Sequence, residues 1–188
     1  MDTSVVPARS FGRALVATLA VAGTIAAVVF GGYLVSGAVS TPAGTPVEVA
    51  DVVRVRPLSG WEVAARFDDP PGVRLTRGSG SFDVVVVAFE GDAEDLATEY
   101  VTAVLEPEAD QLSVSREAES VTLASGLTGV RVAYVGQFGK AAVPIEGEVT
   151  AVVSPSGVGV VFDGWSPEGG LRYVVEDVRS MIETAEVA

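Results

Sequence analysis

A stretch of 26 residues without a single charge, Ala14–Val39, constrains this chain more than any other feature. As an α-helix it would be about 39 Å long, which exceeds the roughly 30 Å hydrocarbon core of a bilayer. Arg9 and Arg13 lie directly before it, and the first charges after it are acidic. The positive-inside rule therefore predicts a transmembrane helix at 14–39, with a cytoplasmic N-terminus at 1–13 and an extracytoplasmic remainder.

A cleaved signal peptide is the alternative for the same stretch. Ala38-Val39-Ser40 offers the small side chains that a signal peptidase accepts. The stretch is much longer than the ~7–15 residues of a signal-peptide core, which favours a retained signal-anchor. A lipoprotein is excluded, because the chain has no Cys to acylate. Residues 40–46, rich in Pro, Gly, Ser and Thr, are expected to link the helix to one domain at 47–188.

Small residues recur at one helical spacing inside the predicted span, at Gly23, Ala27 and Gly31. Such a stripe lets two helix backbones approach closely in a membrane. It indicates self-association, a homodimer through the transmembrane helix. The alternative is that Ala and Gly are simply abundant in this segment.

The composition removes much of the usual chemistry of proteins. The chain has no His, no Cys and no Asn, so it lacks imidazole and thiolate groups for catalysis or metal binding. After residue 39 it carries 10 basic and 24 acidic residues, a net charge of −14. No basic stripe is visible, which argues against a nucleic-acid partner. We predict no catalytic residue, no cofactor and no metal site.

The outer part is expected to be rich in strands, with two helices. One strand, Phe82–Phe89, is apolar on both faces and should lie centrally in the sheet. Further strands are expected at Val47–Arg56, Trp61–Phe67, Val73–Thr76, Val121–Leu123, Val130–Phe138, Gly147–Val153 and Val158–Phe162. The first two of these should pair as a hairpin across the turn at 57–60.

Two helices are expected on this sheet. The first should run from Asp92 to about Leu105 and stop at Pro107, with acidic residues in its first turn, where the helix dipole favours them. The second should follow Ser166 as N-cap and Pro167 at the first helical position. The fold class is therefore α+β, a mostly antiparallel sheet flanked by two helices.

Two tryptophans are the candidate contact residues for a ligand or partner. Trp61 follows a Gly at a strand start, and Trp165 lies just before the second expected helix. Each is more readily explained as a lid on the core, and only a pocket lined by both would favour binding. The acidic group Asp92, Glu94 and Asp95 does not reproduce a calcium-loop spacing and fits a solvated helix start.

The order of elements resembles the PsbP-like (Mog-type) α/β/α sandwich family, and most closely its LpqN-like and DcrB-like envelope proteins. The resemblance rests on Gly60-Trp61, the strand and helix of Phe82–Leu105, the turn and strand of Leu127–Val132, and the final helix with Asp177–Ile182. It implies a non-enzymatic binding or assembly module, and its actinobacterial members imply cell-envelope biogenesis or envelope-lipid transport. No catalytic residue carries over, and the lipid-bearing Cys of the lipoprotein members is missing.

The leading hypothesis is a single-pass membrane protein that presents an extracytoplasmic scaffold or binding domain to an envelope protein partner. The alternative is a carrier that holds a lipid or another apolar small molecule between sheet and helix. The abundance of Ala, Val and Arg with a single Lys fits a GC-rich genome, such as that of an actinobacterium.

Overall fold

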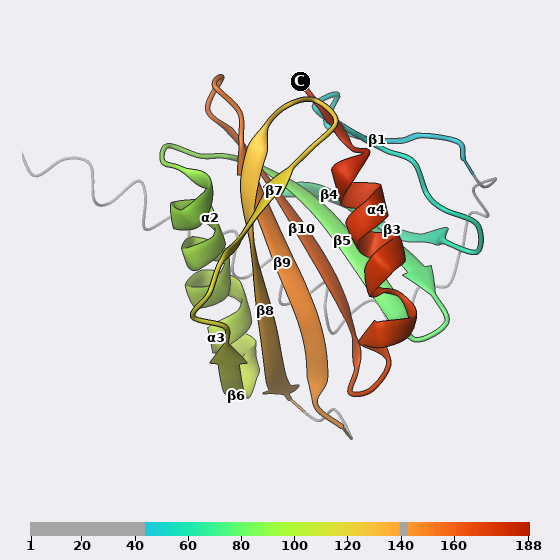
Figure 1. Cartoon of the computed structure of the whole chain (residues 1–188), viewed down its shortest axis with the longest axis vertical. Helices are drawn as coiled ribbons and strands as arrows, with labels where there is room; N and C mark the ends of the chain where they lie inside the picture. The colour runs from blue at the N-terminus through green and yellow to red at the C-terminus, as the bar shows by residue number, and fades with distance from the viewer. Residues whose placement is uncertain (1–43, 140–142) are drawn as a thin grey trace, which may run out of the picture.

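The computed structural model describes residues 44–139 and 143–188, which form an eight-stranded sheet covered on both faces (Figure 1). Within these two ranges no helix is long and apolar enough to cross a bilayer. The predicted features that lie outside the described residues are the cytoplasmic segment at 1–13, the transmembrane helix at 14–39, its small residues Gly23, Ala27 and Gly31, and most of the linker at 40–46.

Every strand pairing is antiparallel, as expected, and the large sheet has the order β3-β4-β5-β10-β9-β8-β6, with β7 also pairing with β8. Its strands are β3 (Glu62–Asp68), β4 (Pro71–Arg77), β5 (Gly80–Ala88), β6 (Ala109–Val114), β7 (Glu119–Thr122), β8 (Thr128–Phe138), β9 (Ile145–Val153) and β10 (Val158–Pro167). A small second sheet has the order β1-β2-β11, and its strands are β1 (Val47–Val49), β2 (Val53–Val55) and β11 (Glu186–Val187).

The central place expected for the most apolar strand is confirmed, because β5 lies between β4 and β10. Val84 and Val86 point into one core cluster, and Val87 packs against the cluster on the other face. A strand buried on both faces needs apolar side chains at consecutive positions, which explains the run of valines.

The first helix, α2 (Ala93–Tyr100), begins directly after Asp92, as its acidic first turn predicted. The Asp92 side chain accepts hydrogen bonds from the backbone N–H groups of Glu94 and Asp95, and the Asp95 carboxylate accepts one from the Asp92 N–H. This capping box satisfies donors that a helix start leaves unpaired. The acidic group is therefore a helix cap, as expected.

The same helix continues through a π-helix, η2 (Val101–Leu105), into one more turn, α3 (Glu106–Glu108). Pro107 lies inside α3 and does not stop the helix at Leu105 as expected. The residues that α2 and η2 bury come in pairs four positions apart: Leu96, Ala97, Tyr100, Val101, Val104 and Leu105. Four residues exceed the ~3.6 of an α-helical turn, and the wider π turn takes up the drift.

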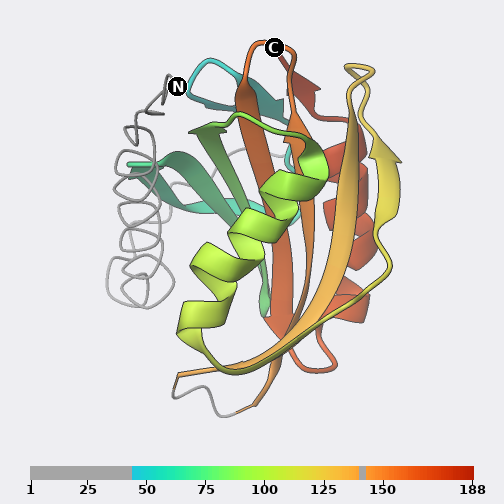
Figure 2. The ribbon, with the colours of Figure 1, turned by 90° about the vertical axis from the view of Figure 1, so that its left-hand side faces the viewer.

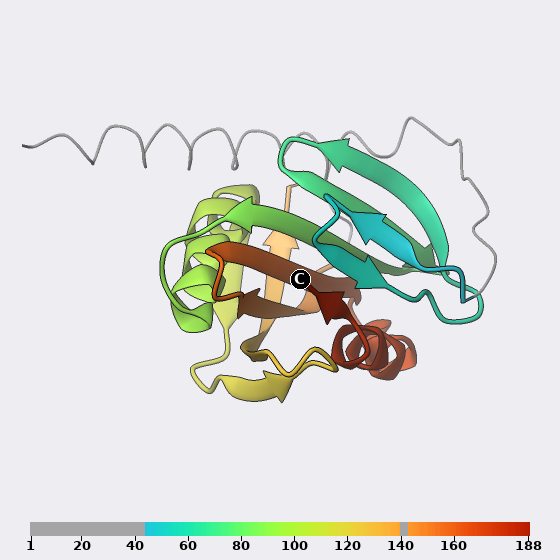
Figure 3. The same ribbon diagram turned by 90° about the horizontal axis from the view of Figure 1, so that it is seen from above.

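This helix lies diagonally across one face of the sheet (Figure 2). Its buried side chains share a cluster with Val149, Ala151 and Val161 of β9 and β10. The opposite face carries the second helix, α4 (Val175–Glu183), and the small sheet, so the large sheet forms the middle layer (Figure 3). The expected sheet flanked by two helices is thus confirmed.

The core on the α4 side is the larger of the two clusters. Val178, Met181 and Ile182 of α4 pack there with Phe82 and Phe162, whose rings stack at 6.2 Å between centroids. The spacing of Met181 and Ile182, three and four residues after Val178, places them on one face of the helix.

The expected start of the second helix is wrong. Ser166 and Pro167 pair with Glu146 and Ile145, so they extend β10 instead of capping a helix. A short 3₁₀ turn, η3 (Leu171–Tyr173), follows, and α4 begins only at Val175. The pairing with β9 continues to Pro167, and the Ser166 hydroxyl contacts Ser79 instead of capping a helix.

The expected strand Val47–Arg56 is also two strands. The chain turns sharply at Ala50 and Asp51, which have positive φ values of 54° and 57°, so β1 folds back on β2. The expected hairpin between this segment and β3 is wrong, because β3 pairs with β4. The alternating valines predicted one continuous strand and carried no signal for the turn that divides it.

Close approach of α4 to the sheet depends on a glycine in β10. A Cβ at Gly164 would come within 2.6 Å of Val178 Cγ1 and 3.3 Å of its Cγ2. We expect Gly164→Ala to lower the free energy of unfolding by about 1–3 kcal/mol, as overpacking does. In Gly164→Ala/Val178→Ala the clash is relieved, so urea unfolding of the full chain in detergent should show less destabilisation than the two single variants summed. Additive effects would contradict this contact.

Candidate functional site

Three charged side chains form a row inside the sheet. Arg74 of β4 is the cross-strand partner of Asp83 of β5, and Asp83 is the partner of Asp163 of β10. All three side chains point to one face and are buried. A buried charge is unfavourable unless it is paired and hydrogen-bonded, so the contacts around this row decide what it does.

The first two members of the row pair directly. Arg74 Nε lies 2.6 Å from Asp83 Oδ1, and Arg74 Nη2 lies 2.7 Å from Asp83 Oδ2, a bidentate ion pair. The guanidinium lies 5.4 Å from the ring centroid of Trp165, whose Nε1 donates to Asp83 Oδ2 at 3.4 Å. Burial opposes the charge of Arg74, but the Asp83 carboxylate outweighs it and raises the arginine pKa.

The third member, Asp163, is held by two tyrosines. Tyr100, the last residue of α2, donates its hydroxyl hydrogen bond to Asp163 Oδ2 at 3.0 Å. Tyr134 of β8 donates to Asp163 Oδ1, also at 3.0 Å. These bonds connect the helix, β8 and β10 around one carboxyl group. The six residues are called the Asp163 cluster below: Arg74, Asp83, Tyr100, Tyr134, Asp163 and Trp165.

A glycine makes room for one of the tyrosines. A Cβ at Gly147 of β9 would fall on the ring of Tyr134, which lies opposite it across the β8–β9 pair. Because Gly147 has no side chain, the Tyr134 ring can pass close to β9 while its hydroxyl reaches Asp163. This is a close approach that a larger residue would block.

Burial raises the pKa of Asp163 from 3.8 to about 7, and the neighbouring charge of Asp83 adds to this. The two tyrosine hydrogen bonds and Arg74 act in the opposite direction but do not cancel it. Burial, followed by the charge of Asp163, also raises the pKa values of Tyr100 and Tyr134 well above their usual value. Asp163 can therefore hold a proton at a pH where an exposed aspartate is ionised.

Sequence reasoning missed this cluster except for Trp165. The available signal was a single acidic residue in each of two apolar strands, Asp83 and Asp163. Their pairing depends on strand register, which the sequence pattern does not specify. Within the described ranges, no three acidic side chains come close enough to hold a metal ion.

The two candidate tryptophans lie in different clusters, on opposite faces of the large sheet. Trp61 is 1% exposed, packs edge-on to Phe82, and donates from Nε1 to Asp177 Oδ2 at 2.9 Å. Trp165 is half-buried beside Asp83. The structure therefore does not bring them together in one pocket. Their role as contacts for a ligand or partner stays a prediction.

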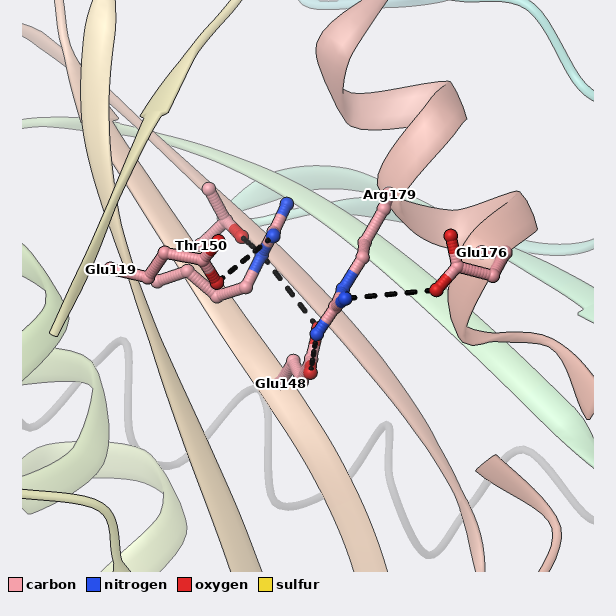
Figure 4. A network of polar contacts seen from close by, with 6 residues as sticks. Glu119, Glu148, Thr150, Glu176 and Arg179 are labelled. Carbon is pink, nitrogen blue, oxygen red and sulfur yellow. Dashed lines mark hydrogen bonds and ion pairs between the residues drawn. The ribbon is translucent and has the colours of Figure 1, made fainter. Parts of the chain in front are cut away.

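A second polar group, the Glu148 bridge, fastens α4 to the sheet (Figure 4). Glu148 of β9 receives two hydrogen bonds from Arg179 of α4, at 2.9 and 2.5 Å. Its side chain is 13% exposed, whereas Glu176, a weaker partner of Arg179 at 3.7 Å, is 83% exposed. The bridge therefore depends mainly on Glu148.

Glu148 also neighbours a buried arginine on the adjacent strand. Arg131 Nε lies 3.7 Å from Glu148 Oε2 and donates to Thr150 Oγ1 at 3.3 Å. Its Nη1 reaches the exposed Glu119 at 3.4 Å, and its buried Nη2 has no hydrogen-bond acceptor within the described part of the chain. Glu148 thus compensates two positive charges.

A surface pocket of about 400 Å³ lies beside the small sheet. Charged side chains contribute much of its lining, among them Glu48, Asp51, Arg54 and Glu186. Arg54 bridges Glu48 and Glu186 across the three strands. A lining of this kind does not suit an apolar ligand.

With this geometry established, comparison with solved structures identifies the architecture. PsbP from the cyanobacterium Synechocystis has a TM-score of 0.57 and 13% identity, over 83% of this chain and 99% of PsbP. The chain has a PsbP/Mog-type fold. The Ran-binding protein Mog1p of Saccharomyces cerevisiae shares this PsbP/Mog-type fold with a TM-score of 0.53 and 12% identity, over 76% of this chain and 94% of Mog1p.

LpqN of Mycobacterium tuberculosis, described as involved in cell envelope biogenesis, reaches a TM-score of 0.49 and 12% identity, over 79% of this chain and 86% of LpqN. No protein-family model and no curated protein sequence matches the chain. The sequence predicted a PsbP/Mog-type fold, and the likeness to PsbP and Mog1p confirms that fold.

Protonation of Asp163 should make stability depend on pH. Because the folded state keeps the proton up to about pH 7 and the unfolded state loses it near 3.8, its contribution to stability falls as pH rises between these values. The free energy of unfolding of the full chain, measured with urea in detergent, should fall relative to that of Asp163→Asn by about 1.4 kcal/mol per pH unit within this window. The exposed control Asp110→Asn should not change the slope, and an unchanged slope in Asp163→Asn would contradict the buried proton.

Removing Glu148 should destabilise the fold far more than removing Glu176. Glu148→Ala leaves the buried Arg131 with only the exposed carboxylate of Glu119, and it also removes the partner of Arg179, so we expect a loss of about 3 kcal/mol in the free energy of unfolding. The matched change Glu176→Ala removes an exposed contact and should lower it by less than about 1 kcal/mol. Equal losses in urea unfolding would show that Arg131 does not depend on Glu148.

Proposed function

We propose that this chain is a single-pass membrane protein that presents an extracytoplasmic, non-enzymatic binding domain. The observation that carries the proposal is the uncharged stretch Ala14–Val39, preceded by Arg9 and Arg13 and followed by an acidic domain of net charge −14. A helix with these flanks inserts with its N-terminus in the cytoplasm. The partner is then a protein of the cell envelope.

The fold supports a role in binding. Mog1p, which shares it, is described as a Ran-binding protein, so this architecture can present a surface to another protein. The chain itself lacks His and Cys, the usual bases and nucleophiles of catalysis. The resemblance of the sequence to LpqN-like envelope proteins adds envelope biogenesis or transport as the process served.

The interior favours a scaffold over a lipid carrier. The side chains of Trp61, Phe82, Phe162 and Met181 fill the space between the sheet and α4, each at most 1% exposed. A carrier of an apolar molecule between sheet and helix would need an unfilled cavity there.

The topology is tested with the full chain, tagged at both ends and expressed in a bacterial host. It should stay in membranes after a carbonate wash, and protease added to spheroplasts should remove the C-terminal tag and spare the N-terminal one. Arg9→Glu/Arg13→Glu should reduce the fraction in this orientation, whereas the control Asp2→Asn should not. A soluble product that begins at Thr41, or a protected C-terminal tag, would overturn the proposal.

A further inference from the structure

One corner of the domain exposes apolar and basic side chains together. Leu58, in the turn before β3, is 36% exposed, and Tyr173 of η3 is 68% exposed. Arg56 and Arg172 beside them are exposed as well. These four residues are called the Tyr173 corner below. Tyr, Leu and Arg are side chains that suit the boundary between lipid and water.

Arg77 holds the two halves of this corner together. Its Nη2 donates to the backbone oxygen of Tyr173 at 2.7 Å, and its guanidinium lies 5.8 Å from the ring centroid of Trp61. The backbone N–H of Trp61 donates to the backbone oxygen of Leu58 at 3.0 Å. The turn before β3 and the start of the C-terminal helical segment therefore lie side by side, as the view from above shows (Figure 3).

Tyr173 and Arg172 are also fixed relative to each other. The guanidinium of Arg172 lies 4.8 Å from the tyrosine ring centroid, and its Nη2 donates to the tyrosine hydroxyl at 2.9 Å. Both side chains are thus oriented before any partner arrives, which lowers the entropy lost on binding.

The chain leaves the described domain at this same corner. The Gly44 N–H bonds the backbone oxygen of Pro57 at 3.1 Å, directly before Leu58. From Val39, the end of the predicted span, to Gly44 the chain advances five residues, which reach at most about 18 Å. A domain of this size has a radius of gyration of about 14 Å, so the attachment point must lie on its membrane-facing half.

The arginines of this corner differ in their charge balance, because Arg77 is neutralised by an ion pair with Asp177, and an exposed acid, Glu62, follows Trp61. Arg56 has no ion-pair partner anywhere in the described residues, and Arg172 bonds only the hydroxyl of Tyr173. The acidic first turn of α2, with Glu94 and Asp95, lies at the far side of the molecule from the turn before β3 and η3 (Figures 1 and 3). An anionic surface would therefore attract the two arginines without an ion pair, Arg56 and Arg172, and repel the acidic start of α2.

We propose that the Tyr173 corner docks onto anionic lipid headgroups of the bilayer that holds the anchor, and so fixes the orientation of the domain. The inference rests on the proposed function, because the anchor supplies the short tether. The ligand class is an anionic phospholipid: the arginines contact phosphate groups, while Leu58 and Tyr173 enter the interface.

The test uses the full chain reconstituted into vesicles of phosphatidylglycerol and phosphatidylcholine. Because the chain has no Cys, Ser59→Cys beside the corner and Thr98→Cys on α2 each give one labelling site. Both positions are exposed and neither belongs to the corner. A fluorophore at Ser59→Cys should be quenched by a lipid with a nitroxide on its headgroup, and the same fluorophore at Thr98→Cys should not.

Variants then separate docking from mere proximity. Arg56→Gln should lower the ratio of docked to undocked domain about 5-fold in phosphatidylglycerol vesicles, as expected for one arginine at an anionic surface. Leu58→Ser/Tyr173→Ser in the same background should abolish the quenching. The exposed control Arg116→Gln, which keeps the corner intact, should leave it unchanged.

The outcomes distinguish the two proposals. Equal quenching at both labels, or quenching that survives the corner variants, in a chain that resists a carbonate wash, overturns the docking and leaves the anchor standing. A chain that leaves the vesicles in carbonate overturns the anchor, and with it the docking.

Discussion

The buried carboxyl group of Asp163 links α2 to the strands that this helix covers. Tyr100 of α2 and Tyr134 of β8 each donate a hydrogen bond to it. The neighbouring Asp83–Arg74 ion pair extends the polar contacts to β5 and β4. Apolar clusters on both faces of the sheet exclude water from this group. The placement of α2 therefore depends on satisfying a polar group that the hydrophobic core would otherwise exclude.

Apolar packing holds both helices to the sheet, but the polar contacts that accompany it differ. α2 contacts a carboxyl that carries a proton at moderately acidic pH, inside a buried cluster that dissolved salt screens only weakly. α4 combines apolar packing with the Arg179–Glu148 ion pair, which is partly open to solvent. The attachment of α2 therefore responds to protons, and the polar part of the α4 attachment responds to ionic strength. Each side of the sheet is sensitive to a different property of the surrounding solution.

Local patterns predicted most of the fold. The apolar run at β5 predicted its central position in the sheet, and Asp92 with its acidic neighbours predicted the start of α2. Both predictions succeeded because they depend on residues that are close together in the chain. The predicted start of α4 was wrong, because the pairing of β10 with β9 outweighs the capping preference of Ser166. The Asp163 cluster could not be predicted, because its members come from β4, β5, α2, β8 and β10 and meet only through strand register.

The small sheet has a consequence for when this domain can fold. β2, near the start of the described domain, pairs on one side with β1 and on the other with β11, formed by Glu186–Val187. More than 130 residues separate Arg54 from its partner Glu186. Contacts of such long sequence separation form late, so this sheet is completed only after the last strand has emerged from the ribosome. Until Glu186–Val187 has been synthesised, β2 therefore keeps one edge without its strand partner, and the described domain cannot close around its larger core cluster.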